Sequence, residues 1–180
     1  MPKNRNASLV TAALISTLLI IVAQSVQSRL AADTALIEPC SLIIDRSMPR
    51  AQVDAQIIAA RRYDTFWHTG DEALARAALA PNFIDNTLPP GRPQGLTGPL
   101  AASKVIRAAI PDMGCEIEQM IVAGDRVVAH LRFHGHFTGR FGRIQGQGQT
   151  INFIATDIYR PVSSQLAEFL RLAPAPASSD

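Results

Sequence analysis

One acid stands in an otherwise apolar strand pattern near the end of the chain. Alternate positions of this predicted strand are Ile151, Phe153, Ala155, Asp157 and Tyr159. A buried carboxylate without a partner is costly, so Asp157 should be paired, exposed at a strand end, or directed into a pocket that uses it. In a pocket it could act as a general acid or base. The alternative is a structural ion pair with a neighbour such as Arg132.

Two histidines stand two residues apart on another predicted strand. His134 and His136 therefore share a strand face, where they could donate hydrogen bonds or bind a metal. This face is opposite to that of Leu131 and Phe133, so the simplest expectation is that it is solvated. A bulge at Gly135 would turn His136 to the inner face, because Gly within a strand often marks a bulge.

A β-hairpin and two further strands must position these residues. Apolar and polar residues alternate through 117–121 and again through 127–133. Gly124 between the two runs suits a tight turn, which predicts an antiparallel hairpin. The strand with Asp157 follows a Gly-rich and Gln-rich loop at 139–148, and a last short strand is expected at Gln165–Leu172.

Three segments before the hairpin have apolar residues at helical spacing. They are Gln52–Trp67, Glu72–Leu79 and Leu100–Ile110. Gly70 suits the C-terminal cap of the first helix, and Asp71 places negative charge at the start of the second. Helices followed by strands predict the α+β class, in which the three helices pack on one face of a strongly curved antiparallel sheet.

The N-terminus has the pattern of an export segment. Lys3 and Arg5 precede an uncharged apolar run at 7–23, which predicts an apolar helix. Residues 1–28 are expected to be a signal peptide or a membrane anchor, and either would place an exported domain in the periplasm or another extracytoplasmic compartment. A spacer at 29–49, a domain at 50–173 and a disordered tail at 174–180 complete the expected organisation.

Composition excludes some classes of function. The chain has 180 residues and a formal net charge of +2, without a basic patch, which argues against nucleic-acid binding. The only cysteines, Cys40 and Cys115, fit no metal-ligand spacing. An exported chain could pair them, or both could be free thiols.

Six short motifs follow one another along the chain. They are YDTFWHTGD from Tyr63, APNFIDN from Ala80, GLTG from Gly95, IPDM from Ile110, AGDRVVAHLRFHGHFTG from Ala123 and FIATDIYR from Phe153. In order and spacing they resemble the motifs of the SnoaL-like polyketide cyclases, which have the fold of nuclear transport factor 2. The resemblance covers about residues 52–172.

This resemblance implies a cone-shaped domain with a deep, mostly apolar cavity for a small apolar molecule such as a carbonyl compound or ester. It also implies an intramolecular aldol reaction that needs no metal or other cofactor. Asp157 matches the family's acid on the penultimate strand, and His136 matches the histidine of the GHFTG motif. Both are therefore candidate catalytic residues. The family's Trp-His pair on the last strand is replaced by Leu170-Arg171.

Loss of that imidazole leaves a second hypothesis open, in which the same fold is a non-catalytic ligand-binding or dimerisation module. A homodimer is thus one expected assembly, and an uncleaved N-terminus would add the membrane as a partner. The candidate substrate-binding residues are Tyr63, Trp67, Phe83, Asp85 and Phe153. For the aromatic residues the alternative is core packing. For Asp85 it is a turn before the proline-rich loop.

Overall fold

The computed structural model describes residue 24 and residues 35–172. The chain divides into a unit at 1–36 and a unit at 37–180, and the elements below belong to the second unit. The expected leader, apart from residue 24, and the tail at 174–180 lie outside the described residues. No helix among the described residues is long and apolar enough to cross a membrane.

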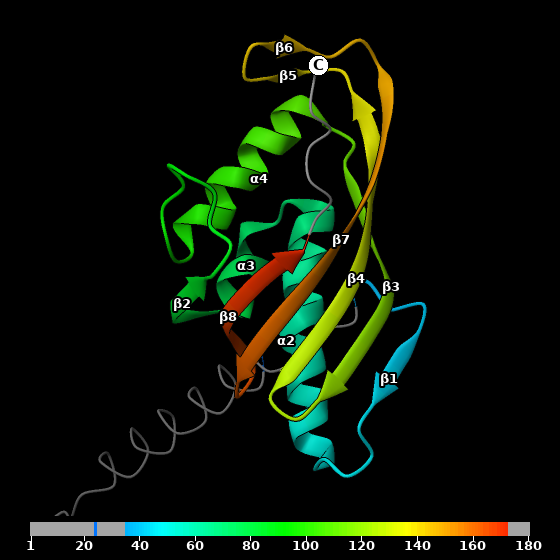
Figure 1. The fold of residues 1–180 in the computed structure, drawn as a ribbon, viewed down its shortest axis with the longest axis vertical. Helices are drawn as coiled ribbons and strands as arrows, with labels where there is room; N and C mark the ends of the chain where they lie inside the picture. Colours follow the sequence, from blue (N-terminus) through cyan, green and yellow to red (C-terminus); the bar gives the residue numbers. More distant parts are fainter. Residues whose placement is uncertain (1–23, 25–34, 173–180) are drawn as a thin grey trace, which may run out of the picture. The chain divides into compact units, whose positions relative to one another are not determined.

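The described part of the second unit contains a six-stranded sheet with the order β1-β3-β4-β7-β8-β2 (Figure 1). Its four central strands are antiparallel: β3 Gly114–Ala123, β4 Arg126–Phe137, β7 Gln149–Val162 and β8 Gln165–Leu172. The predicted hairpin is confirmed, because Ala123 pairs with Arg126 across a two-residue turn. Gly124 in that turn has a φ of 58°, which a Gly adopts at little cost.

Two short edge strands pair in parallel, which local alternation did not predict. β1 (Leu42–Ile44) pairs with β3, and β2 (Leu79–Asp85) pairs with β8. β1 lies in the segment expected to be a spacer, so part of that segment belongs to the sheet. The three residues of β1 are too few to show the alternation of a strand. Parallel partners are joined by long connections, so a local sequence pattern does not reveal them.

The three predicted helices are present as α2 Arg50–Thr69, α3 Glu72–Ala78 and α4 Thr97–Ala109. Gly70 ends α2 in the left-handed conformation and donates its N–H to the carbonyl of Phe66 at 2.7 Å. Asp71 caps α3 by accepting a hydrogen bond from the N–H of Ala73 at 2.9 Å. These contacts confirm the boundary predicted between the two helices.

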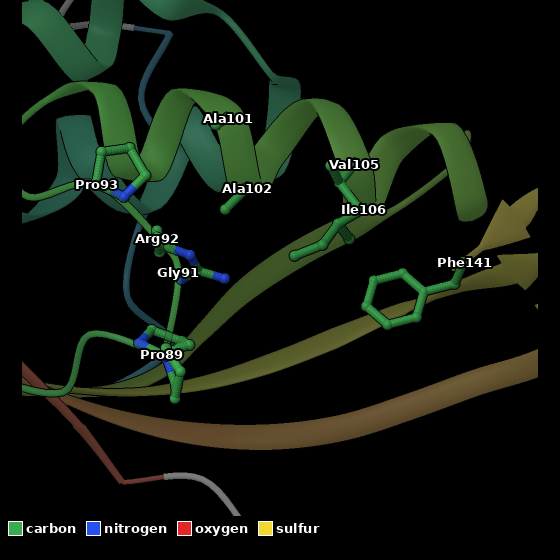
Figure 2. Close-up of a pocket in the computed structure, with 10 residues that line it drawn as sticks. Pro89, Gly91, Arg92, Pro93, Ala101, Ala102, Val105, Ile106 and Phe141 are labelled. Carbon is green, nitrogen blue, oxygen red and sulfur yellow. The ribbon is translucent and has the colours of Figure 1, made fainter. Parts of the chain in front are cut away.

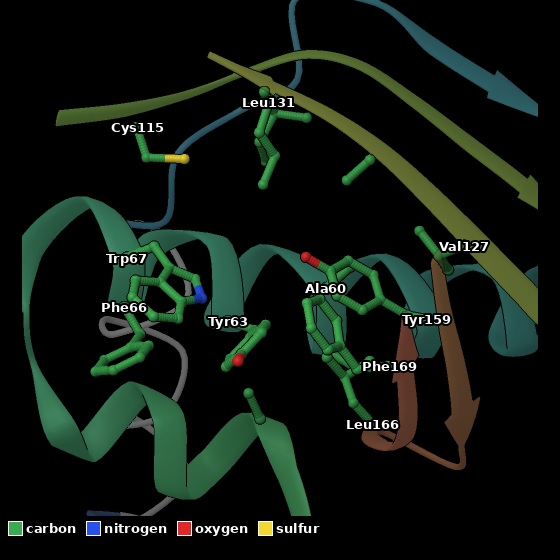
Figure 3. Close-up of a cluster of buried hydrophobic side chains, with 14 of the residues drawn as sticks. Ala60, Tyr63, Phe66, Trp67, Cys115, Val127, Leu131, Tyr159, Leu166 and Phe169 are labelled. Carbon is green, nitrogen blue, oxygen red and sulfur yellow. The ribbon is translucent and has the colours of Figure 1, made fainter. Parts of the chain in front are cut away.

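The helices pack on one face of the curved sheet, and α2 contacts β3, β4, β7 and β8. The predicted α+β fold is confirmed. Tyr63 and Trp67 point from α2 into the core, where Tyr159 and Phe169 approach from the sheet (Figure 3). The ring centroid of Tyr63 lies 6.0 Å from those of Trp67, Tyr159 and Phe169.

A small hairpin within the Gly-rich segment 139–148 consists of β5 (Arg140–Phe141) and β6 (Ile144–Gln145). This hairpin and the C-terminal end of α4 lie at the same end of the sheet (Figure 1). The described fold therefore has an aromatic core under α2 and a separate region between α4 and the hairpin.

Candidate active site

Asp157 forms a buried ion pair with Arg171. Its side chain is fully buried, and the guanidinium donates from Nε to Oδ1 at 2.7 Å and from Nη2 to Oδ2 at 2.6 Å. The two residues are direct partners in the β7–β8 register. Arg132, the neighbour considered from the sequence, instead pairs with Glu118. The ion-pair partner of Asp157 therefore lies on β8, and the expectation that Asp157 pairs with Arg132 is wrong.

Aromatic rings surround the guanidinium of Arg171. Its central carbon lies 5.4 Å from the ring centroids of Trp67 and Phe169, and 5.5 Å from that of Phe133. Burial disfavours the charged form of Arg171, but the charge of Asp157 and the hydrogen bonds to it raise the pKa of the guanidinium above its ordinary value. Cation–π contacts stabilise the same charge. Arg171 is thus a fixed cation at the inner face of the sheet.

Tyr159 connects Asp157 to a second buried acid, Asp64 on α2. The Tyr159 Oη lies 3.0 Å from Asp157 Oδ2 and 2.6 Å from Asp64 Oδ1. Burial raises the pKa of Asp64 well above its ordinary value. Burial likewise raises the pKa of Tyr159, and the charge of Asp157 raises it further. Four polar residues therefore form one continuous network inside the core.

Sequence reasoning did not select Asp64, Tyr159 or Arg171 as site residues. Asp64 follows Ala60 and precedes Trp67 at helical spacing, and this position on the apolar side of α2 was the available signal. In the sequence, Arg171 is distinguished only as the residue that stands in place of the family's imidazole. Its role depends on the cross-strand register, which the sequence pattern does not specify.

An apolar cavity lies between α4, the β5–β6 hairpin and the ends of β4 and β7. Its volume is about 260 Å³. The lining residues are Ile106, Ala109, Ile110, Phe137, Phe141, Ile144, Ile151 and Phe153. Phe153 stacks on Phe133 with ring centroids 4.9 Å apart, and Phe133 also contacts Arg171. The stacked rings of Phe153 and Phe133 therefore connect the lining of the cavity to Arg171.

A second pocket of about 320 Å³ lies between the proline-rich loop and α4 (Figure 2). Ile106 and Phe141 line both this pocket and the apolar cavity. Arg92 supplies the only charged side chain among its lining residues in the described chain. The loop 88–95 thus borders a pocket next to the apolar cavity.

The predicted substrate-binding residues separate into three places. Tyr63, Trp67 and Phe83 lie in the aromatic core, whereas Phe153 lines the apolar cavity. Asp85 is 7% exposed and accepts hydrogen bonds from the N–H of Thr87 at 2.8 Å and from its hydroxyl at 3.0 Å. It therefore shapes the turn before the proline-rich loop. The binding roles of these residues remain predictions.

His136 is not brought together with Asp157. Its side chain is 55% exposed, and its Nδ1 lies 2.6 Å from Asp112 Oδ2. Gly135 pairs with Ile151 in an unbroken β4–β7 register, so the bulge that would turn His136 inwards is not present. The predicted catalytic role of His136 would therefore require it to act from the outer face of the sheet.

Close packing explains the glycine at position 135. A Cβ there would lie 2.6 Å from Ile110 Cγ2 and 3.2 Å from Met113 Cα, and the backbone has a φ of 154°. We expect Gly135→Ala to lower the free energy of unfolding by about 1–3 kcal/mol, because the added methyl forces the α4–β3 connection away from the sheet. Urea denaturation measures this loss. Gly91→Ala is the control for backbone strain, because Gly91 also has a positive φ, of 80°, but no heavy atom lies within 4 Å of the added methyl. An equal loss in this variant would show that backbone strain is the cause and would exclude packing.

Metal-ligand and thiol chemistry have little support within the described residues. No group of three or more His, Cys, Asp or Glu side chains there could hold a metal ion. Cys40 is exposed, Cys115 is buried and both are free thiols. Burial raises the pKa of the Cys115 thiol, so this thiol is a weak nucleophile.

The chain matches a known protein family over most of its described residues. Residues 57–169 match the family model described as SnoaL-like polyketide cyclase. The chain belongs to the SnoaL-like polyketide cyclase family. A solved structure of a proposed polyketide cyclase from Bacillus cereus is 34% identical in sequence, with a TM-score of 0.71. The match covers 78% of this chain and 88% of that one. No curated protein matches the chain significantly.

Other SnoaL-like structures share the fold at lower identity. A proposed SnoaL-like polyketide cyclase from Jannaschia is 17% identical, with a TM-score of 0.61, and the match covers 72% of this chain and 92% of that one. IdmH, a proposed polyketide cyclase from Streptomyces antibioticus, is 18% identical, with a TM-score of 0.58 and coverage of 64% and 89%. The family resemblance seen in the sequence is confirmed, and a cyclase-type or ligand-binding role follows for this member.

Proposed function

We propose that this SnoaL-like protein binds a small, largely apolar carbonyl compound or ester and promotes an aldol-type ring closure, with Asp157 as general acid/base. One observation carries the proposal. The inner face of β7 presents Ile151 and Phe153 to the apolar cavity and, further along the same face, the fully buried carboxylate of Asp157. Two structural relatives, the protein from Bacillus cereus and IdmH, are named proposed polyketide cyclases, and these names support the same class of reaction.

The charges around Asp157 suit chemistry at a carbon next to a carbonyl group. Such a reaction needs a base for the carbon-bound proton and a donor for the enolate oxygen that develops. Asp157 supplies the carboxylate, and the guanidinium of Arg171 is a positive charge within hydrogen-bond distance of it. The side chain of Arg171 is 24% exposed, so part of this side chain is accessible from outside the core.

Filling the cavity tests ligand binding. We expect Ile151→Trp to weaken binding of straight-chain methyl ketones at least about tenfold, a loss of about 1.4 kcal/mol, because the indole occupies the space of the ligand. Native mass spectrometry or calorimetry with ketones of increasing length measures the affinity. Ile154→Trp is the matched control, since Ile154 lies on the same strand, is 41% exposed and does not line the cavity. Equal affinities for wild type and Ile151→Trp would place the ligand elsewhere.

A second candidate function, holding a ligand without converting it, is favoured by the Arg171 contact. Arg171 donates to both oxygens of Asp157, and these hydrogen bonds occupy acceptor positions that a substrate proton would need. Recovery of the bound ketone unchanged after long incubation would support this candidate. Detection of a cyclised product would support the enzyme.

Export and self-association are also proposals. The basic start and apolar run at 7–23 support export. The outer face of the sheet carries the Arg132–Glu118 pair and the exposed His134. A dimer through this face would therefore be joined by polar contacts, and sedimentation at several protein concentrations would detect it.

A further inference from the structure

The hydroxyl of Tyr159 lies between two carboxyl groups but has only one proton. Its oxygen is 2.6 Å from Asp64 Oδ1 and 3.0 Å from Asp157 Oδ2, and all three side chains are fully buried. If both acids were ionised, Tyr159 could donate to one of them, and its oxygen would face the other without a proton between them. Such an unpaired contact in the core is costly. A second proton must therefore lie on one of the two acids.

Arg171 decides which acid carries this proton. The guanidinium makes two hydrogen bonds to Asp157, at 2.7 and 2.6 Å, an arrangement that selects the ionised carboxylate. Among the described residues Asp64 forms no ion pair, and its Oδ2 has no hydrogen-bond partner there. The proton is consequently on Asp64. Asp64 donates to Tyr159, Tyr159 donates to Asp157, and the network of one anion and one cation is neutral.

The ionisable groups around Asp64 agree with this assignment. Tyr159 and Asp157 face it from β7, Arg171 from β8 and Cys115 from β3. Burial raises the pKa of Asp64 most strongly. The hydrogen bond with Tyr159 opposes this shift, the charge of Asp157 adds to it, and the charge of Arg171 opposes it.

We propose that Asp64 is a positioning residue, protonated at neutral pH, that directs the Tyr159 hydroxyl onto Asp157 Oδ2. A carboxylate has about four acceptor positions. Arg171 and Tyr159 occupy both acceptor positions of Oδ2, and Arg171 occupies one of the two positions of Oδ1. The remaining acceptor position is therefore on Oδ1. Asp64 thus selects Oδ1 as the oxygen that takes the substrate proton. This selection rests on the proposed function, whereas the protonation of Asp64 does not.

Infrared spectroscopy of the ligand-free full chain tests the protonation. At neutral pH the wild type should show the C=O stretching band of an unionised carboxyl, and Asp64→Asn should lack it. Asn has nearly the shape of a protonated Asp and can donate from its amide to Tyr159. Asp54→Asn is the matched control, because Asp54 is an exposed acid on the same helix, paired with Arg50. An absent band in the wild type, or one that survives in Asp64→Asn, overturns the proposal.

Tyr159→Phe tests the chain itself. The carboxyl of Asp64 then loses its acceptor, so its C=O band should move to higher frequency. A band that stays at the wild-type frequency contradicts the Asp64–Tyr159 contact. Carbon-13 NMR of aspartate-labelled wild type makes the test independent of any variant. The Asp64 carboxyl carbon should keep the shift of a protonated acid at neutral pH, and the shift of a carboxylate would overturn the proposal.

Stability against pH gives a third measurement, with a defined sign. A group whose pKa is raised in the folded state contributes stability that is fully present below its unfolded pKa of about 3.9 and is lost as pH rises towards the folded pKa. Asp64→Asn removes this loss. The ratio of the unfolding constants of wild type and Asp64→Asn should therefore rise from acid to neutral pH by up to about tenfold per pH unit. A ratio independent of pH would overturn the assignment, whatever the outcome of the ligand-binding experiments.

Discussion

Asp157→Asn is expected to slow the ring closure of a bound linear diketone by about 10²–10⁴-fold, the usual contribution of a positioned acid/base group. Asn preserves the shape of the side chain and can accept a hydrogen bond from Arg171, but it cannot take a proton from carbon. Single-turnover reactions followed by liquid chromatography and mass spectrometry measure the rate. Circular dichroism shows whether the variant is folded.

Glu118→Gln is the matched control for this experiment. Glu118 is also an acid paired with an arginine across strands, but its partner is Arg132 and it lies on the outer face of the sheet. Its replacement should leave the rate unchanged. An unchanged rate in Asp157→Asn would remove Asp157 from the mechanism and would favour the ligand-holding function.

Arg171→Met should lower the free energy of unfolding by about 3–5 kcal/mol. The substitution removes the cation that neutralises Asp157 and leaves a fully buried carboxylate without its ion-pair partner. Met has a comparable length and can fill the space between the rings of Trp67 and Phe133. Urea denaturation at neutral pH measures the loss.

A double variant separates the lost charge from lost packing. Asp157→Leu with Arg171→Met leaves no buried charge in the pair, so it should regain most of the stability that Arg171→Met loses. Arg50→Met is the control, because Arg50 is 83% exposed and its pair with Asp54 should be worth at most about 1 kcal/mol. A loss below about 1 kcal/mol in Arg171→Met would show that the carboxylate is not held by this pair.

Local signals in the chain were sufficient for most of the fold. Gly70 and Asp71 mark a helix end and a helix start because each satisfies backbone groups within a few residues of itself. Alternation over 127–133 identified the inner face of β4, since side chains of a strand point to opposite sides in turn. The short parallel edge strands were missed because their partners are distant in sequence.

The sequence by itself determined the α+β class, the family and the presence of an acid on the inner face of a strand. Tertiary structure alone decided which groups that acid meets. Asp64 lies 95 residues before Tyr159, and Arg171 reaches Asp157 only through the pairing of β7 with β8. A local pattern describes how one element distributes its polar and apolar residues. Contacts between elements depend on how those elements pack, and this packing brings Asp64, Tyr159, Asp157 and Arg171 into one network.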